Sequence, residues 1–518
     1  MRKVFGIENF RLAQEGFCNA NMDGRDAICI MPTGGGKSLT YQLPATLMPG
    51  CTLVISPLVS LMKDQMLHLQ ENRIEGLMFT ASMSNAEKVE AYDRLNATAM
   101  GNDPAREVKL CYVTPERIGK SKKFMSVVGT MVTAKKLARI VIDEAHCVSQ
   151  LGHDYRPDYK QLASLRMLYP HVPILALSAT CPPVVLRDLI ATLRLPPLTD
   201  GRGAASHGTV LFTSPLYRKN LHYKVLPKPP GSARLMRDMV KYILEHHPNQ
   251  SGIVYCLSRA DSERVAADLD SVSQGRIKTG VYHAEINDKA KEELHESWRR
   301  GRVKVVCATI AFGLGIDKAD VRFVLHHSKS VETFYQESGR AGRDGRDADC
   351  IMYYRLQDAL RTPGILSDPD WQRQVHGMAK FCLDLQGCRK LEYFSSFDST
   401  WAEDNSRCGH CDNCTRDPAS VVQSDVTLDA KRVLAVARIL HSRKIKVTAA
   451  QLALTTRGAG PQSKLLQLAP GDKVTLSPLD TETLMAHMLL EGYLEKSYTP
   501  TAYRVQVYIK PGARARRL

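Results

Sequence analysis

The amino-acid sequence predicts an α/β fold with two tandem domains, each a parallel sheet covered by helices, followed by a smaller helical region. The first observation is that short β-rich runs alternate with helical stretches twice along the chain, which is typical of parallel sheets. The second is a glycine-rich turn between an apolar run and a helical stretch near the N-terminus. The third is a group of closely spaced cysteines in the C-terminal third, which indicates a small metal-stabilised region.

The alternation of strands and helices divides the chain into two blocks. The first runs from residue 5 to about residue 216, with predicted strands at 27–30, 53–55, 109–113, 139–142 and 174–177. The second begins near residue 217, with predicted strands at 252–256, 279–282, 303–307, 322–325 and 350–354. Residues 201–214 are rich in Gly, Ser and Thr and are expected to form a loop. Two such domains leave a cleft between them, and ligands bind at the carboxyl ends of such strands.

The composition favours a reduced, intracellular protein with a polyanionic partner. Of 518 residues, 44% are hydrophobic, and Lys plus Arg outnumber Asp plus Glu by 70 to 54, a formal charge of +16. This surplus indicates nucleic acid first and an acidic membrane surface second. No apolar run is long enough to span a membrane, and the N-terminus has no secretory pattern. Ten of the 14 cysteines are scattered, many of them within apolar runs, as reduced core thiols are.

A phosphate-binding loop is predicted at residues 31–38. A short apolar strand precedes Thr33-Gly34-Gly35-Gly36-Lys37-Ser38, and residues 39–47 can continue as a helix. The glycines let backbone N–H groups curl around a phosphate, Lys37 adds a full charge, and Ser38 can ligate magnesium. The general pattern has glycine where this chain has Met31, so a glycine-rich turn with an incidental lysine is the alternative.

Two adjacent acids, Asp143 and Glu144, follow the predicted strand at 139–142. At the carboxyl end of a strand, the first acid can hold the magnesium ion of a bound nucleotide and the second can activate the attacking water. The alternative is a polar strand exit without chemistry. Together with Lys37 and Ser38 upstream, the pair predicts a nucleotide hydrolase.

Four cysteines have the spacing of a structural zinc site. They follow the pattern C-x19-C-x2-C-x2-C and are Cys388, Cys408, Cys411 and Cys414. Four thiolates complete the tetrahedral coordination of zinc, which leaves no open position for catalysis. His410 and Cys382 are the alternative ligands.

Further motifs follow in order, and with them the chain closely resembles the RecQ family of DNA helicases in superfamily 2, nearest to its eukaryotic Bloom-type members. The motifs are Phe5-Gly6 through Gln14, the glycine-rich loop, Ser56-Pro57-Leu58 with Met62-Lys63-Asp64-Gln65, Thr114-Pro115-Glu116-Arg117, Asp143-Glu144-Ala145-His146, Leu177-Ser178-Ala179-Thr180, Tyr255 through Arg259, Ala311 through Lys318 and Tyr335 through Gly345. The resemblance implies two RecA-like domains, a zinc-binding subdomain and a winged-helix domain.

The resemblance also implies roles for single residues. Those implied in holding the nucleotide are Arg11, Gln14, Thr33, Gly34, Gly35, Gly36, Lys37, Ser38, Gly315, Asp317 and Gln336. Those implied in binding DNA are Ser56, Lys63, Arg117, His153, Tyr155, Arg156, Ser258, Arg259, Lys464, Tyr498 and Tyr503.

Arg340 and Arg343 are the candidate catalytic arginines, beside Lys37, Asp143 and Glu144. They lie three residues apart, so both can face the same side of a helix. An arginine from a second domain stabilises charge on the transferred phosphoryl group only when the cleft closes, and closure can thereby move the domains along a strand. Arg343 is favoured as the arginine finger; an arginine-bearing surface helix is the alternative.

The resemblance sets the domain boundaries. Residues 1–216 and 217–356 are predicted to be the RecA-like domains, 357–420 the zinc-binding subdomain, 421–512 the winged-helix domain and 513–518 a disordered basic tail. The hairpin at 493–510 would form the wing, and its turn carries Tyr498 and Tyr503. These rings can stack on a terminal base pair or be ordinary cross-strand neighbours. We expect no interaction region before the helicase core and no further module after the wing.

One loop departs from the family pattern, which usually has Trp-Gly-His-Asp-Phe-Arg-Pro after the acidic motif. This chain has Leu151 in place of the tryptophan, followed by Gly152, His153, Asp154, Tyr155, Arg156 and Pro157. Stacking of a base on an aromatic face is worth on the order of 1–3 kcal/mol, and leucine cannot provide it. We therefore expect Leu151 to weaken the link between DNA binding and ATP hydrolysis, with partial compensation by Tyr155.

Taken together, the motifs predict an ATP-dependent DNA helicase of the nucleus. ATP, Mg²⁺ and Zn²⁺ are the expected cofactors, and single-stranded, forked or branched DNA is the expected partner, together with repair and recombination proteins. Movement from 3′ to 5′ is implied by the resemblance alone. The alternative is a DNA-stimulated ATPase that remodels or anneals strands without processive unwinding. A purely structural nucleic-acid binder conflicts with the full set of ATP residues.

Overall fold

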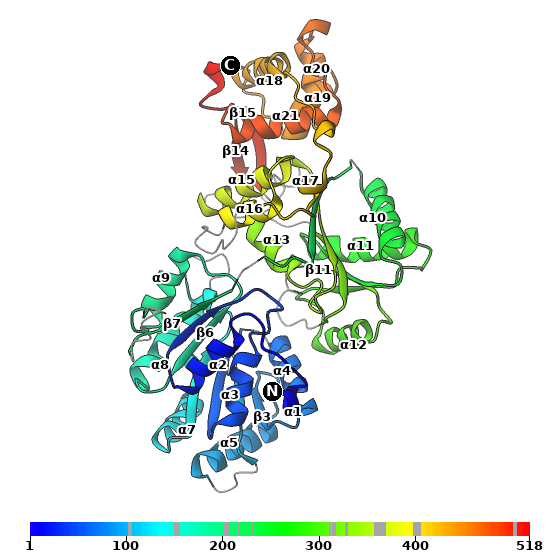
Figure 1. The fold of residues 1–518 in the computed structure, drawn as a ribbon. Helices are drawn as coiled ribbons and strands as arrows, with labels where there is room; N and C mark the ends of the chain where they lie inside the picture. The colour runs from blue at the N-terminus through cyan, green and yellow to red at the C-terminus, as the bar shows by residue number, and fades with distance from the viewer. Residues whose placement is uncertain are drawn as a thin grey trace.

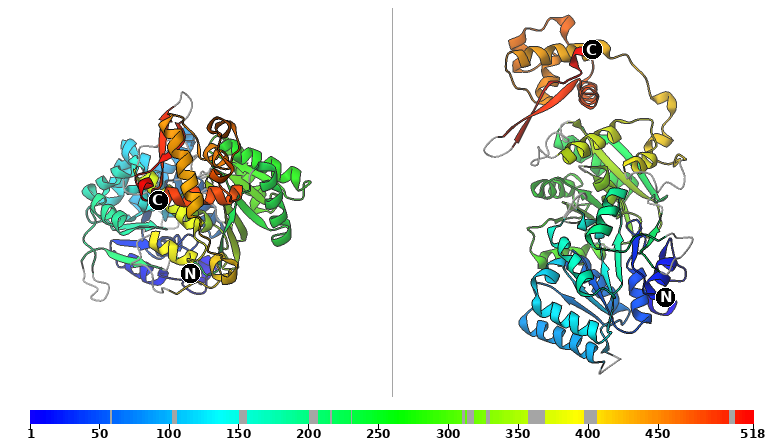
Figure 2. Two further views of the ribbon diagram at one scale, coloured as in Figure 1. Left: turned by 90° about the horizontal axis from the view of Figure 1, so that it is seen from above. Right: turned by 90° about the vertical axis from the view of Figure 1, so that its left-hand side faces the viewer.

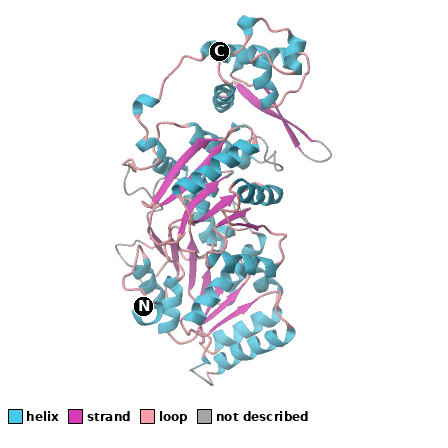
Figure 3. Cartoon of the chain, turned by 90° about the vertical axis from the view of Figure 1, so that its right-hand side faces the viewer, coloured by secondary structure: helices cyan, strands magenta, loops and turns pink. Residues whose placement is uncertain are grey.

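Two parallel sheets and a C-terminal hairpin, surrounded by helices, make up the protein (Figure 1). The structure is a computed structural model. It describes residues 1–57, 59–101, 106–149, 156–199, 207–214, 217–229, 231–309, 312, 318–326, 330–356, 369–396, 406–500 and 505–518. Within them, the strands of the two large sheets lie inside and the helices cover their faces (Figure 3), which confirms the predicted fold class.

The first sheet has seven strands in the order β3-β4-β2-β5-β6-β1-β7. All neighbours are parallel. The strands are β1 (Ala27–Ile30), β2 (Cys51–Ile55), β3 (Gly76–Phe79), β4 (Leu110–Val113), β5 (Leu137–Ile142), β6 (Ile174–Ser178) and β7 (Val210–Thr213). Every residue of β1, β2, β4 and β6 is buried, as expected where helices cover both faces of a sheet.

Nine α-helices belong to this part of the described chain. They are α1 (Arg2–Phe5), α2 (Gln14–Met22), α3 (Leu39–Leu47), α4 (Val59–Glu71), α5 (Asn85–Met100), α6 (Pro115–Lys120), α7 (Lys122–Thr133), α8 (Ala163–Leu168) and α9 (Pro183–Thr192). The predicted helix at 39–47 is confirmed as α3. None of the helices in the described part of the chain has both the length and the apolar character that crossing a bilayer requires.

The second sheet has six parallel strands in the order β10-β11-β9-β12-β13-β8. They are β8 (Leu221–Pro227), β9 (Ser251–Tyr255), β10 (Thr279–Tyr282), β11 (Val305–Ala308), β12 (Val321–His326) and β13 (Ala348–Tyr354). The accompanying helices are α10 (Ser232–His246), α11 (Arg259–Val272), α12 (Asp288–Arg299) and α13 (Val331–Ser338).

The sequence analysis missed three strands at or near the edges of the sheets. These are β3, β7 and β8. The prediction of a loop over 201–214 is wrong at its C-terminal end, because Val210–Thr213 pairs in register with β1. The run Val-Leu-Phe-Thr consists of strand-favouring residues, and its pairing covers an edge of β1 that would otherwise expose unpaired backbone groups.

A helical region follows the second sheet. It contains α15 (Pro369–Leu383), α16 (Arg389–Ser396), α17 (Asp412–Thr415), α18 (Thr427–Ser442), α19 (Ala449–Thr456), α20 (Pro461–Leu466) and α21 (Pro478–Leu490), with the antiparallel hairpin of β14 (Leu494–Pro500) and β15 (Val505–Pro511). The unit from α18 to β15 stands at one end of the molecule after an extended segment (Figure 2). Arg355 holds this unit to the second sheet through a bidentate pair with Glu482, at 2.7 Å and 2.6 Å.

The predicted disorder of the basic tail is wrong. Residues 515–517 form a 3₁₀ turn, in which Ala515 is only 4% exposed. Arg438 donates a hydrogen bond to the carbonyl of Ala515. Arg514 pairs with Glu491 at 3.0 Å and lies 5.3 Å from the ring centre of Tyr493. The small side chain of Ala515 fits the core of the helical unit, and the neighbouring arginine has a partner on that unit.

Candidate nucleotide and zinc sites

The phosphate loop lies between β1 and α3. Gly34 and Gly36 have φ angles of 80° and 79°, a region that favours glycine because it has no Cβ. The side-chain amide of Gln14, which is buried, donates to the carbonyls of Gly35 at 3.3 Å and Gly36 at 3.1 Å. Its own oxygen accepts from the backbone N–H of Arg11 at 2.7 Å. The opening segment therefore braces the loop.

The acid pair lies at the carboxyl end of β5. The carboxylate of Asp143 accepts from the backbone N–H of Glu144 at 3.0 Å, and the hydroxyl of Ser56 lies 3.5 Å from it. Burial and the neighbouring Glu144 raise the pKa of Asp143 to about 7, while the charge of Lys37 opposes the rise. A bound magnesium ion would stabilise the ionised form of Asp143, as the charge of Lys37 does. The carboxylate of Asp143 therefore fits a magnesium ion, for which Asp143 and Ser38 remain the predicted ligands.

A chain of polar contacts leads from Glu144 to the end of β6. Glu144 has left-handed backbone angles, φ 48° and ψ 47°, which are costly for a residue other than glycine and are found at functional sites. Its carboxylate lies 3.4 Å from Nδ1 of His146, and that nitrogen lies 3.0 Å from the hydroxyl of Ser178. The Ser178 hydroxyl donates to the carbonyl of Thr180 at 2.5 Å. The acid is thus connected to the Ser178–Thr180 segment.

The second domain brings Arg343 to the phosphate loop. A Cβ atom at Gly34 would lie 3.1 Å from Cγ of Arg343, and one at Gly339 would lie 2.9 Å from Cβ of Thr33. Arg340 is 7% exposed and interacts with Tyr255 on β9. The cleft between the two sheets therefore unites the phosphate loop with Arg343, whereas the interaction of Arg340 with Tyr255 lies within the second domain. Gln336 is half-buried on the adjoining helix α13.

Arg218, just before β8, is a member of this cleft that the sequence analysis missed. Its guanidinium donates to the carbonyls of Gly339, at 2.9 Å, and Gly342. The same group lies 3.4 Å from where a Cβ of Gly34 would be. A single arginine outside any recurring pattern gives no signal in the sequence, because only the packing of the two domains brings it to the site.

Three residues predicted to bind DNA lie at or near the carboxyl ends of strands in the first sheet. Ser56 follows β2 but is 1% exposed and turned toward Asp143. Arg156 donates to the carbonyl of Pro57 at 3.2 Å. Arg117 donates to the carbonyl of Thr80 at 3.4 Å. The two arginines are only partly buried, so they, unlike Ser56, are accessible to a DNA strand.

Carboxylates of the second sheet domain hold two further cations that were predicted to bind DNA. Lys63 on α4 pairs with Glu292 on α12, and Arg259 at the start of α11 pairs with Glu285. The hydroxyl of Ser258 caps α11 by accepting from the backbone of Asp261 at 3.1 Å. Ser258 and Arg259 line a cavity of about 440 Å³. Helices α4 and α12 lie next to each other across the boundary between the domains (Figure 1).

The remaining predicted residues are distributed as follows. Lys464 is exposed on α20, and Tyr498 on β14 lies opposite Val507. The residues that lie outside the described part of the chain are Leu151, His153, Tyr155, Gly315, Asp317 and Tyr503.

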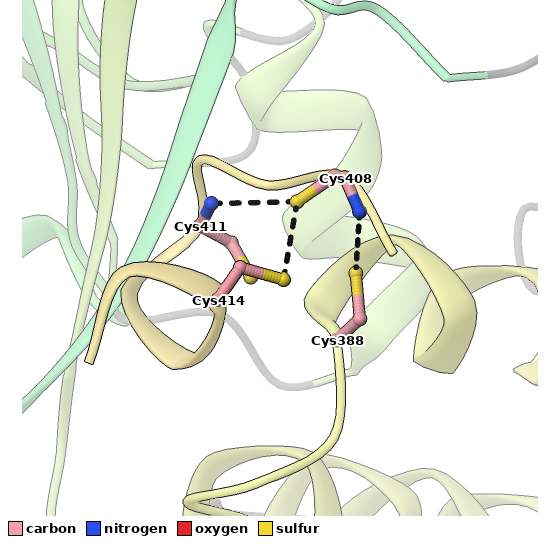
Figure 4. Close-up of side chains that lie close together, drawn as sticks. All are labelled: Cys388, Cys408, Cys411 and Cys414. Carbon is pink, nitrogen blue, oxygen red and sulfur yellow. Dashed lines mark hydrogen bonds between the residues drawn. The ribbon is translucent and has the colours of Figure 1, made fainter. Parts of the chain in front are cut away.

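Four sulfur atoms converge between α16 and α17 (Figure 4). The Sγ atoms of Cys388, Cys408, Cys411 and Cys414 all lie within 4.8 Å of one another. Backbone N–H groups donate to Cys388 Sγ at 3.2 Å and to Cys408 Sγ at 3.3 Å. The hydrogen bonds shared among these thiols lower the pKa of Cys408 and raise that of Cys411, so it is the convergence of the sulfur atoms that favours a metal site. The cluster fits a tetrahedral zinc ion.

The two alternative zinc ligands are engaged elsewhere. Nδ1 of His410 lies 2.8 Å from the carbonyl of Cys408, and Nε2 is hydrogen-bonded to the hydroxyl of Tyr217. Cys382 is buried in α15, and burial raises the pKa of its thiol. The four-cysteine set is therefore favoured over sets that include either residue.

A buried ion pair anchors the cysteine loop to the second sheet. Arg389 is fully buried and donates to both carboxylate oxygens of Asp412, at 2.9 Å and 3.0 Å. The Asp412 carboxylate also accepts from the backbone N–H of Val225 on β8 at 3.0 Å. Such outer contacts fix the position of metal-binding residues, and here they also fix the loop to the domain that carries the arginines.

Comparison with protein families agrees with this fold and site. Two parallel-sheet domains with a phosphate loop in one and arginines in the other define a nucleotide hydrolase of the helicase class. Residues 11–189 match the DEAD/DEAH box helicase family, and residues 235–345 match the helicase conserved C-terminal domain.

Relatives extend the match over the chain. ATP-dependent DNA helicase Q1 of Pongo abelii is 38% identical over 99% of this chain and 76% of its own length. ATP-dependent DNA helicase Q-like 2 of Arabidopsis thaliana is 37% identical over 99% and 69%. ATP-dependent DNA helicase hus2/rqh1 of Schizosaccharomyces pombe is 37% identical over 99% and 38%. The chain belongs to the RecQ family of ATP-dependent DNA helicases.

Solved structures share the fold at low sequence identity. Helicase Lhr of Mycobacterium smegmatis, bound to ssDNA and AMP-PNP, has a TM-score of 0.53 and 17% identity, covering 99% of this chain and 60% of its own. Mss116p, bound to ssRNA and AMP-PNP, has a TM-score of 0.54 and 12% identity, covering 84% and 82%. These likenesses concern the fold alone.

The acid pair and the phosphate loop give the first prediction. Glu144→Gln removes the proton acceptor for water but keeps the phosphate loop, so ATP binding should persist while turnover falls on the order of 10²-fold or more. Lys37→Ala should also remove most turnover. Steady-state ATPase assays with DNA and binding of a fluorescent ATP analogue measure the two effects. Glu90→Gln, at an exposed position on α5, is the matched control, and near-parental turnover of Glu144→Gln would exclude the proposed role.

The cysteine cluster gives the second prediction. Cys411→Ser should lower zinc content and increase cleavage by protease across 388–414, because the binding energy of a structural zinc ion is largely folding energy. Metal analysis and limited proteolysis measure this. Cys382→Ala is the control, since this buried cysteine lies outside the sulfur cluster and should keep full zinc content. Well-folded parent protein without zinc would contradict the assignment.

Proposed function

We propose that the protein is an ATP-dependent DNA helicase that moves 3′ to 5′ and separates duplex, forked or recombination-intermediate DNA. The observation that carries the proposal is the contact of Gly339 and Arg343 with Thr33 and Gly34 across the domain boundary. Because hydrolysis needs both sides of this contact, each turnover requires the cleft to close. Membership of a family of ATP-dependent DNA helicases supports the conversion of closure into movement along DNA.

The residues of the cleft divide the hydrolysis of ATP among them. The phosphate loop and Lys37 bind the phosphates, and Ser38 and Asp143 would hold Mg²⁺, which neutralises phosphate charge when bound. The Glu144 carboxylate takes a proton from water as the water oxygen bonds to the γ-phosphorus. The bond from that phosphorus to the bridging oxygen breaks, and ADP and inorganic phosphate leave. Arg340 and Arg343 stabilise the charge that develops on the transferred group.

A DNA strand fits the cations near the carboxyl ends of the strands. We assign phosphate contacts to Lys63, Arg117, Arg156 and Arg259, and a duplex contact to Lys464. Side chains of this kind position the backbone without reading sequence. Tyr498 lies on the hairpin, where an aromatic ring can stack on an end base pair. Ser56 is left out of this assignment because its hydroxyl is buried beside Asp143.

The proposed location in the cell and the proposed cellular process follow from the DNA substrate and from the relatives. The relatives reported above come from eukaryotes and are named as DNA helicases, and we therefore propose a nuclear location. Repair, recombination and replication are the processes in which forked and branched DNA arises, and proteins of these processes are the proposed partners.

Strand displacement tests the function. Duplexes with a single 3′ or 5′ tail are incubated with ATP, a non-hydrolysable analogue or no nucleotide, and released strand is measured. We expect ATP-dependent release from the 3′-tailed substrate, and no release by Lys37→Ala. Equal release from both tails would overturn the polarity. ATP turnover stimulated by DNA without displacement would instead establish a remodelling or annealing ATPase.

The pairing of Lys63 with Glu292 gives a further prediction. Glu292→Gln frees the lysine for a DNA phosphate, and an exposed ion pair is worth roughly 0.2–1 kcal/mol. Single-stranded DNA should therefore bind about 1.4- to five-fold more tightly. The slope of log affinity against log salt should steepen by about 0.7, the value for one additional phosphate contact on a single strand. Fluorescence anisotropy with a labelled oligonucleotide at several salt concentrations measures both.

Glu293→Gln is the matched control for this prediction. Glu293 is exposed on the same helix, so its neutralisation changes the net charge equally without freeing Lys63. Lys63→Ala should weaken binding in the parent and abolish the gain from Glu292→Gln. An equal gain from both glutamine variants would reduce the effect to net charge.

A further inference from the structure

Arg218 lies between the arginine loop of the second domain and the phosphate loop of the first. Its Nη1 donates to the carbonyl of Gly339 at 2.9 Å, and its Nη2 donates to the carbonyl of Gly342. These two carbonyls flank Arg340 and closely precede Arg343. On its other side the guanidinium lies 3.4 Å from where a Cβ of Gly34 would be. One side chain thus contacts the arginine loop and faces the phosphate loop.

Among the residues that the structure describes, no carboxylate forms an ion pair with Arg218, although the charge of Asp344 acts on it from farther away. Both of its side-chain hydrogen bonds within the described residues end on carbonyl oxygens rather than carboxylates. A guanidinium has five N–H donors, so two bonds leave donors for an anion. A fixed positive charge beside a phosphate loop is the arrangement that binds a phosphate oxygen through charge-assisted hydrogen bonds.

Contacts on both sides of Arg218 hold its segment in place. The hydroxyl of Tyr217 is hydrogen-bonded to His410 in the cysteine loop, and Lys390 lies 5.4 Å from the centre of its ring. The side chain of Asn220 donates to the carbonyls of Gly342, at 2.8 Å, and Arg346, at 2.7 Å. A side chain fixed in this way needs little reorganisation to bind an anion, which is the condition for strong electrostatic stabilisation.

We propose that Arg218 is a third arginine of the ATP site. It binds the terminal phosphate of ATP when the cleft is closed, and through Gly339 and Gly342 it positions the loop that carries Arg340 and Arg343. ADP lacks that phosphate, so Arg218 stabilises the closed cleft with ATP and not with ADP. The inference deepens the proposed ATPase function and rests on it, because it names a residue that reports the nucleotide state to the second domain.

Nucleotide affinity and turnover test the proposal together. Arg218→Ala should weaken a non-hydrolysable ATP analogue about ten-fold or more while leaving ADP affinity unchanged. It should also lower kcat roughly ten- to a hundred-fold through misplacement of the arginine loop. Arg218→Lys keeps a charge but cannot bridge both carbonyls, so it should restore much of the analogue affinity and little of kcat. Fluorescent nucleotide titrations and DNA-stimulated ATPase assays provide the values.

The Asn220→Ala variant distinguishes support of the arginine loop from binding of the terminal phosphate. Asn220 bonds the same Gly342 carbonyl but carries no charge, so its removal should leave the ratio of analogue to ADP affinity at the parental value. An Arg218→Ala variant that keeps the parental ratio would overturn the proposal, as would an Asn220→Ala variant that loses the ratio equally. A parent protein without ATPase activity would instead refute the proposed function, so the two failures are distinguishable.

Discussion

The approach of Gly339 and Arg343 to Thr33 and Gly34 is the contact on which the rest of the structure depends. A Cβ atom at Gly34 would lie 3.1 Å from Cγ of Arg343, and one at Gly339 would lie 2.9 Å from Cβ of Thr33, so the backbone of each glycine packs closely against a side chain of the other domain. The first domain supplies phosphate binding and the acid pair, and the second supplies the arginines. In the proposed function neither sheet alone completes the chemistry, and the nucleotide would therefore control how the domains are arranged.

The cysteine cluster supports the same contact indirectly, through strand β8. Strand β8 lies at the edge of the second sheet, where unpaired backbone groups are normally a liability. The carboxylate of Asp412 accepts the N–H of Val225 on that edge, and Tyr217, just before the strand, contacts His410. The loop that fits zinc thus closes the edge and fixes the start of β8, and Arg218 stands at that start. A structural metal site and the ATP cleft share one short segment of chain.

Features of this arrangement that depend on residues close together in the chain can be predicted from the sequence, and features that depend on distant residues cannot. A phosphate loop, an acid pair and a C-x19-C-x2-C-x2-C pattern each lie within a short stretch, and strand and helix alternation predicts the two sheets. Arg218 and the pair of Lys63 with Glu292 depend on domains that pack together over long separations, so no periodicity shows them. The ordering of Ala515 likewise depends on a core formed by distant helices. Side-chain chemistry was therefore predictable, and the family resemblance also predicted the approach of Arg343, but the partners of Arg218 and Lys63 were not predictable.

The ion pairs between α4 and α12 contribute little to the closure of the cleft. Besides Lys63 and Glu292, Arg299 pairs with Glu71 at 3.3 Å, and all four side chains are at least 38% exposed. Exposed pairs contribute about 0–1 kcal/mol each and weaken with salt, so two pairs bias closure only slightly. Arg218 and Arg343, which face the phosphate loop, are half-buried, so their charges are screened less than those of the exposed pairs. A bound nucleotide should therefore dominate closure, while the exposed pairs remain weak enough for DNA phosphates to replace their carboxylates.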